Sequence, residues 1–138
     1  APGGVTTEGT SKPLEGSGLS PEQLKKIMED FVKKVTKAKA IKGPRFVHAL
    51  APCPPGWRYS SEKTIEIGRL ATDTNVFPLY EIENGVSRIS RKLGIAKPVA
   101  EYFKTQGRFA HLTDAELAAI QSEVDGRWKR LLALEGLA

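Results

Sequence analysis

Apolar residues recur at helical spacing over residues 20–39, and this pattern predicts a long amphipathic helix. Ser20 is the expected N-cap, Pro21 occupies the first helical position, and Gln23 completes a capping box with Ser20. The glycine and proline at 43–44 then end the helix. We expect Met28 and Phe31 to be core residues rather than cofactor contacts. The whole apolar face consists of Leu24, Ile27, Met28, Phe31, Val32, Val35 and Ala38, with lysines on the opposite face.

The next three segments predict a strand, a second helix and a hairpin. The mostly apolar run 45–50 is interpreted as a buried strand. Ser60 or Ser61 can cap the second helix, whose apolar positions are Ile65, Ile67, Leu70 and Ala71. The segments 78–83 and 86–90 flank Asn84-Gly85, which indicates a hairpin because both central turn positions need a positive φ.

The last part of the chain is predicted to be helical, in contrast to its beginning. One helix starts at Pro98 and extends to about Thr105, with Val99, Tyr102 and Phe103 as its apolar residues. Thr113 and Glu116 form a second capping box, which opens a C-terminal helix. Its apolar positions are Leu117, Ile120, Val124, Trp128, Leu131 and Leu132. Residues 1–19 are rich in Gly, Thr, Ser and Pro and are expected to form a loop or an extended arm.

Length and composition are those of one globular domain. The chain has 138 residues, 40% of them hydrophobic, which is enough to bury a core. No stretch approaches the roughly 20 apolar residues of a membrane span, and the first residues do not have the pattern of a signal or transit peptide. The single cysteine excludes an intrachain disulfide framework and favours a reducing cytoplasm. The sequence does not begin with Met, so a processed chain, a truncation and a fragment all stay open.

The chain is basic, with a formal net charge of +5 and a pI near 9.4. Its basic residues cluster on the first and last predicted helices, as Lys25, Lys26, Lys33, Lys34, Lys37 and Lys39, and as Arg127, Lys129 and Arg130. A solvated helix face is the simplest interpretation, because lysines opposite an apolar face keep a helix soluble. Docking of an acidic protein is an alternative. Nucleic acid is the weakest one, because the chain has no recognisable recognition helix or aromatic RNA-binding motif.

The only cysteine, Cys53, lies in a run rich in proline that ends at Trp57. Proline fixes φ and donates no backbone hydrogen bond, so this loop is expected to be stiff, to lie outside regular structure and to aim its thiol in one direction. The loop follows the predicted strand, and binding sites in open α/β sheets lie outside the carboxyl ends of strands. A metal or cluster ligand, a buried structural cysteine and a Cys–His nucleophile are the three interpretations, and no residue was found that would orient a Cys–His pair.

Few other residues point to chemistry. His48 and His111 are 63 positions apart and neither has metal-ligand spacing with another histidine, so we interpret His48 as a structural histidine. No glycine-rich phosphate loop leads into a helix. Trp57 either shields a site from water or plugs the loop onto the core, and we favour the plug.

Several segments carry a resemblance to a known family. They are 43–57 (GPRFVHALAPCPPGW), 63–71 (KTIEIGRLA), 77–85 (FPLYEIENG), 97–103 (KPVAEYF) and 106–112 (QGRFAHL). In this order they resemble the C-terminal part of the thiamine-diphosphate subunit of 2-oxoacid:ferredoxin oxidoreductases, the pyruvate synthase family. The resemblance covers residues 37–112, and the opening residues 1–7 add a short match to a threonine-rich segment of that subunit.

The resemblance implies an α/β fold, the C-terminal portion of a thiamine-diphosphate-binding domain with a β-hairpin and a helical C-terminal extension. It also implies an enzyme that decarboxylates a 2-oxo acid on thiamine diphosphate, passes electrons through 4Fe-4S clusters to ferredoxin, and transfers the acyl group to coenzyme A. Cys53 matches the family's cluster ligand in the Pro-Cys loop. Thiolates on stiff loops with apolar surroundings suit such a cluster.

Departures from the family limit what this chain does alone. It has no second cysteine, so the other cluster ligands lie outside it, and it lacks the Gly-Asp-Gly…Asn-Asn stretch that binds Mg²⁺ and the diphosphate. We therefore expect an arm over 1–19, the C-terminal region of the cluster-bearing subunit over 20–112, and a C-terminal helix over 113–138. The expected partners are the rest of the oxidoreductase, ferredoxin, a 2-oxo acid and coenzyme A, and the isolated chain is expected to be inactive. The alternative function is a non-catalytic basic module for subunit assembly or ferredoxin docking.

Overall fold

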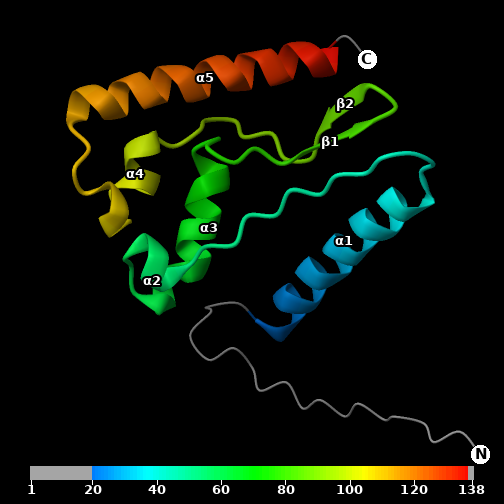
Figure 1. The fold of residues 1–138 in the computed structure, drawn as a ribbon, viewed down its shortest axis with the longest axis horizontal. Helices are drawn as coiled ribbons and strands as arrows, with labels where there is room; N and C mark the ends of the chain where they lie inside the picture. The colour runs from blue at the N-terminus through cyan, green and yellow to red at the C-terminus, as the bar shows by residue number, and fades with distance from the viewer. Residues whose placement is uncertain (1–19, 137–138) are drawn as a thin grey trace, which may run out of the picture. The chain divides into compact units, whose positions relative to one another are not determined.

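The computed structural model describes residues 20–136, so the predicted arm over 1–19 lies outside the described residues (Figure 1). The chain divides into two compact units between Val47 and His48. Each unit is described by itself below. No helix within residues 20–136 has the length and apolarity needed to cross a membrane.

The first unit contains helix α1 (Pro21–Ala40), which the sequence predicted. The Ser20 hydroxyl oxygen accepts the Gln23 N–H at 3.2 Å, and the Gln23 side-chain oxygen accepts the Ser20 N–H at 2.9 Å. This reciprocal pair is the predicted capping box, and it satisfies two backbone donors that the helix itself leaves unpaired. Local sequence is thus sufficient to start this helix.

The apolar face of α1 is not buried, which corrects the expectation for Met28 and Phe31. Their exposed fractions are 61% and 48%, and no residue of this fully described helix is buried. The helical pattern shows that one face is suited to burial, but it does not identify the surface that covers it. Within the described part of this unit, α1 is the only regular element. Among residues 20–47, the apolar face therefore has no second regular element to pack against.

The predicted strand over 45–50 is wrong. Within residues 20–136 the only sheet is a two-stranded hairpin further along the chain, and 45–50 has no regular secondary structure. A strand needs a neighbour to complete its backbone hydrogen bonds, and an apolar run by itself does not supply one. Phe46, in the middle of this run, is 87% exposed. The cysteine loop therefore does not start from the end of a strand.

The core of the second unit forms around helix α3 (Thr64–Asp73), which confirms the second predicted helix. Ile67, Leu70 and Ala71 on α3 pack with Tyr102 of helix α4 (Val99–Phe103) as one buried cluster. Leu50, Trp57, Tyr59, Val76, Phe77 and Phe103 surround this cluster. The expected serine cap is not formed on α3, because a 3-10 turn (Ser61–Lys63) comes first and the N-cap of α3 is Lys63.

The hairpin is confirmed, with strands β1 (Tyr80–Glu83) and β2 (Val86–Ile89) paired antiparallel. Asn84 and Gly85 have φ values of 52° and 83°, as a tight hairpin turn requires. Both strands are slightly shorter than the predicted segments. The predicted helix over 98–105 is likewise confirmed in a shorter form as α4, with Val99 and Tyr102 buried.

Helix α5 (Asp114–Gly136) runs along the second unit from α4 to the hairpin (Figure 1). The predicted capping box is present: the Thr113 hydroxyl accepts the Glu116 N–H at 3.3 Å, and the Glu116 carboxylate accepts the Thr113 N–H at 2.8 Å. The hydrogen bond from the Thr113 backbone holds the pKa of Glu116 below its ordinary value. Leu117, Val124 and Leu131 are buried at seven-residue intervals, which places them on one helix face.

Two long-range hydrogen bonds join α5 to the rest of the unit. The Gln121 side-chain oxygen accepts the Val99 N–H at 2.8 Å, and the Glu135 carboxylate accepts the Ile89 N–H at 2.9 Å. Glu135 also forms an ion pair with Lys92. One bond is at the start of α4 and the other is on β2, so α5 holds both elements in place.

Candidate metal-ligand site

Cys53 lies at the N-cap of a one-turn helix, α2 (Pro54–Trp57), and is exposed. The two prolines occupy the first helical positions, where the missing N–H groups break no helical hydrogen bond. The Cys53 carbonyl accepts the Trp57 N–H at 2.9 Å, and the Pro54 carbonyl accepts the Tyr59 N–H at 3.2 Å. The segment is therefore a closed, proline-fixed turn with an exposed thiol. The expectation that it lies outside regular structure is wrong, because proline is tolerated in the first turn of a helix and Pro54 and Pro55 begin one here.

The sulfur of Cys53 lies close to the backbone of its own turn. A methyl group placed on Gly56 would lie 3.4 Å from Sγ, so the glycine leaves room for the sulfur with little to spare. The turn ends at Arg58, whose φ of 56° and ψ of 61° are in the left-handed region. Such a conformation is rare outside glycine and needs support from the surrounding structure.

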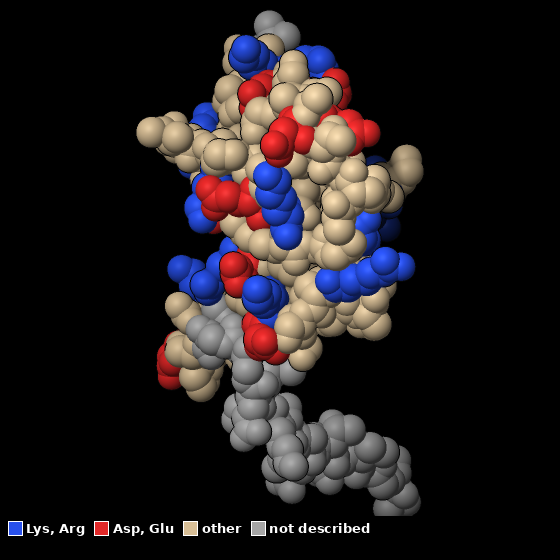
Figure 2. Space-filling view, turned by 90° about the vertical axis from the view of Figure 1, so that its left-hand side faces the viewer, with Lys and Arg blue, Asp and Glu red and all other residues tan. Residues whose placement is uncertain are grey.

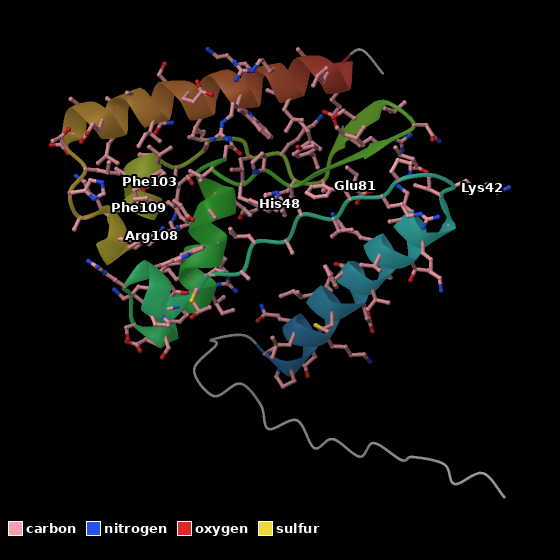
Figure 3. The ribbon with its side chains drawn as sticks, viewed as in Figure 1. Lys42, His48, Glu81, Phe103, Arg108 and Phe109 are labelled. Atoms are coloured by element: carbon pink, nitrogen blue, oxygen red, sulfur yellow. The ribbon has the colours of Figure 1, made fainter. Side chains whose placement is uncertain are left out.

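A 3-10 turn, η2 (Gly107–Phe109), packs against this loop and comes from a part of the sequence about fifty residues away. The Arg108 guanidinium lies 3.9 Å from the centre of the Trp57 ring and 4.5 Å from the centre of the Phe109 ring. Phe109 in turn meets Phe103 edge to face, with ring centres 4.8 Å apart. Figure 3 shows Phe103, Arg108 and Phe109 grouped together beside α4. Trp57 thus packs on the core cluster, as the plug interpretation expected, and carries a cation on its ring.

The backbones of the two segments also meet. The Gly107 N–H donates to the Arg58 carbonyl at 3.0 Å, and a methyl group on Gly107 would lie 2.9 Å from both the carbonyl oxygen and Cβ of Arg58. Only glycine fits there without a backbone shift. The sequence pattern did not predict a role for Gly107 or Arg108. Residues 106–109 belong to the segment 106–112, which was notable only for its resemblance to the family. No local signal links two segments that meet only in the folded chain.

The other titratable candidates do not form a metal site. Within residues 20–136 no group of three or more His, Cys, Asp or Glu side chains is close enough to hold a metal ion. His48 is exposed, and its ring lies edge to face against Phe77 with ring centres 5.0 Å apart. His111 is exposed. Among residues 20–136, the exposed thiol of Cys53 is therefore not part of a complete metal site.

Positive and negative side chains are mixed on the face of the molecule that Figure 2 shows. Figure 2 shows Lys and Arg side chains interspersed with Asp and Glu on the visible face, without a continuous stripe of one sign. Elsewhere the ion pairs Lys104–Asp114 at 3.1 Å and Lys97–Glu101 at 3.4 Å likewise bring opposite charges together on the second unit. On this face the charges do not resemble a nucleic-acid-binding groove.

Curated relatives identify the protein class, whereas no protein-family model matches the chain. Pyruvate synthase subunit PorB of Methanocaldococcus jannaschii is 55% identical over 103 residues, which are 75% of this chain and 35% of that protein. Ketoisovalerate oxidoreductase subunit VorB of Pyrococcus horikoshii is 45% identical over 108 residues, 77% of this chain and 35% of that protein. PorB of Thermotoga maritima is 47% identical over 111 residues, 77% of this chain and 34% of that protein.

The chain spans about a third of the length of these relatives. The identities extend over most of the chain, and the names belong to oxidoreductase subunits for two different 2-oxo acids. Over about three quarters of its length, the chain is homologous to the beta subunit of 2-oxoacid:ferredoxin oxidoreductases, as the sequence motifs indicated.

Proposed function

We propose that this chain is the C-terminal region of the thiamine-diphosphate-binding subunit of a 2-oxoacid:ferredoxin oxidoreductase, and that Cys53 is one ligand of a 4Fe-4S cluster. The observation that supports this most strongly is the geometry of the single thiol. Cys53 is exposed at the start of a closed turn, within a segment that resembles the family's Pro-Cys loop. A structural cysteine is typically buried, whereas a cluster ligand must be accessible to iron.

In the whole enzyme, clusters of this kind carry electrons from the decarboxylated 2-oxo acid to ferredoxin while coenzyme A takes the acyl group. In this proposal the described residues supply one exposed thiol at the start of a closed, proline-fixed turn. Trp57, the last residue of α2, is half-buried and packs against the core cluster, so it attaches the turn to an apolar surface. Apolar surroundings and fixed ligand geometry are two of the means by which a protein sets a cluster's potential.

The remaining ligands and the thiamine-diphosphate motif belong to chain segments outside this sequence. One feature of the described residues supports a larger assembly. The apolar face of α1 is about half exposed. A contiguous exposed apolar face of this kind typically marks a surface that other protein covers. The isolated chain is accordingly proposed to be inactive, with the complete enzyme in the cytoplasm.

The direct test replaces Cys53 in the complete enzyme. Cys53→Ala removes the thiolate, so the EPR signal of one reduced cluster should disappear and the iron content should fall. Ser60→Ala changes an exposed side chain close to the same loop and is the matched control. A Cys53→Ala enzyme that retains every cluster signal and its full iron content would refute the ligand assignment.

A non-catalytic docking module for other subunits or ferredoxin is the second candidate, and the observation that favours it is the uncovered face of α1. Lys25 and Lys33 on this helix pair with its own Glu29 and Asp30, at 4.0 and 3.6 Å, and remain largely exposed. Docking through such charges weakens with salt, because interactions beyond a Debye length of about 8 Å are screened near physiological ionic strength. Binding of an acidic partner that does not change between low and high salt would contradict charge-driven docking.

A further inference from the structure

We propose that Arg108 is a positioning residue: it fixes Trp57 and, through Trp57, the turn that carries Cys53. Contacts within this chain support the role of Arg108 in fixing the turn. The effect of Arg108 on a bound cluster rests on the function proposed above. Residues 106–109 are called the clamp segment below.

The clamp segment contacts residues 53–58, called the cysteine turn, at two points. The first is the ring of Trp57, which faces the Arg108 guanidinium at 3.9 Å. Phe109 lies 4.5 Å from the same guanidinium, so the cation contacts two aromatic rings. The second point is the backbone hydrogen bond from Gly107 to the Arg58 carbonyl, which supports the left-handed residue that ends the turn. Two contacts at one end of a single turn restrict both its position and its rotation.

The clamp segment is itself tied to the core. Gln106 is 1% exposed and donates from its side-chain nitrogen to the Tyr102 carbonyl at 2.9 Å. Its side-chain oxygen accepts from Arg108 Nε at 3.0 Å. The guanidinium plane is therefore oriented by a buried amide attached to α4. Arginine suits this task because its planar head stacks on a ring while its edge donates hydrogen bonds, which lysine cannot do in the same way.

The restraint reaches Cys53 through one helical turn. The Trp57 N–H donates to the Cys53 carbonyl at 2.9 Å, and the two prolines between them fix φ. A methyl group added to Gly56 would lie 3.4 Å from the sulfur, so the turn leaves little space on that side of the thiol. An isolated turn of this length is not stable in water, because helix nucleation is unfavourable. Docking on the clamp segment thus accounts for the stability of the turn and for the direction of its thiol.

The first test uses the 138-residue chain, whose single cysteine accepts one nitroxide spin label. Arg108→Ala should make the label on Cys53 distinctly more mobile in its EPR spectrum, and Arg108→Lys should give an intermediate spectrum. Arg88→Ala, which removes an exposed arginine on β2, is the matched control and should leave the spectrum unchanged. Equal label mobility in wild type and Arg108→Ala, with helicity retained by circular dichroism, would overturn the proposal.

A measurement on the unaltered chain covers the case in which Arg108→Ala does not fold. Hydrogen exchange should show the Trp57 and Tyr59 amides protected to an extent comparable with amides of α3. Exchange of both amides at the rate of an unfolded peptide, while α3 remains protected, would show that the turn is not held and would overturn the proposal.

The second test uses the complete oxidoreductase. Arg108→Ala should retain iron but broaden the EPR line of the cluster that is lost in Cys53→Ala, because a looser ligand samples several geometries. An unbroadened line would contradict a positioning role at the cluster. If Cys53→Ala instead leaves all clusters intact, the ligand assignment fails, while the label and exchange measurements still decide whether Arg108 holds the turn.

Discussion

Replacing Gly107 by alanine should loosen the cysteine turn and lower the stability of the second unit. The added methyl group would lie 2.9 Å from both the carbonyl oxygen and Cβ of Arg58, well inside van der Waals contact. Neither atom belongs to a flexible side-chain end, so the backbone must move and the 3.0 Å hydrogen bond between Gly107 and Arg58 must lengthen. Overpacking of this kind costs about 1–3 kcal/mol, and a lost hydrogen bond costs on the order of 1 kcal/mol more.

A smaller effect opposes this cost, because alanine restricts the unfolded chain and thereby stabilises the folded one by about 0.4–1 kcal/mol. The expected net loss is about 1–3 kcal/mol in the free energy of unfolding, measured by urea denaturation. Gly94→Ala is the matched control, because a methyl group there meets no atom within 4 Å. It should be neutral or slightly stabilising. If Gly107→Ala and Gly94→Ala are equally stable, the close packing of Gly107 on Arg58 is refuted.

Three further predictions test other contacts. Gln121→Ala leaves the N–H of buried Val99 without its acceptor, so urea denaturation should show that the free energy of unfolding falls by about 1–3 kcal/mol. Ser122→Ala, which changes an exposed residue, is the control, and an equal loss in both variants would contradict this prediction. The hydrogen bonds from Lys92 and from the Ile89 N–H hold the pKa of Glu135 below its ordinary 4.5. Because the folded-state pKa is lowered, Glu135 stabilises the fold above about pH 4.5, and this contribution is lost as the pH falls through the lowered value. Glu135→Gln should therefore flatten the acid side of the curve of unfolding free energy against pH. Parallel curves for the wild type and the variant would refute the link between Glu135 ionisation and stability. Tyr59→Phe removes a buried hydroxyl that has no partner among the described residues, so thermal unfolding of the chain should show equal or higher stability, and a clear loss would reveal a hydrogen bond that completes it.

Elements defined by neighbouring residues were predictable from the sequence. Both predicted capping boxes form, one between Ser20 and Gln23 and the other between Thr113 and Glu116, because each joins groups only three residues apart. The hairpin turn at Asn84-Gly85 is equally local, since it depends on two residues that tolerate positive φ. In these cases the chemistry of a few adjacent side chains determines the backbone.

Features that depend on distant residues were not predictable. The run 45–50 has the composition of a strand but no neighbouring strand to pair with in the described chain. Met28 and Phe31 have the spacing of core residues, yet they are exposed because helical periodicity does not specify a partner surface. The contact of Arg108 with Trp57 joins residues about fifty positions apart. The prolines in the sequence predicted a stiff segment around Cys53. The contacts of Trp57 and Arg58 with residues 107–108, which hold that segment on the core, became visible only in the structure.

The proposal that Cys53 itself is a ligand of the 4Fe-4S cluster can be tested in the complete enzyme. The experiment replaces Cys53 with selenocysteine that carries the magnetic isotope of selenium. We predict a selenium hyperfine coupling in the ENDOR spectrum of one reduced 4Fe-4S cluster, because the ligand atom shares the unpaired spin of the iron. A fully loaded enzyme whose reduced clusters show no selenium coupling would contradict the assignment of Cys53 as a ligand.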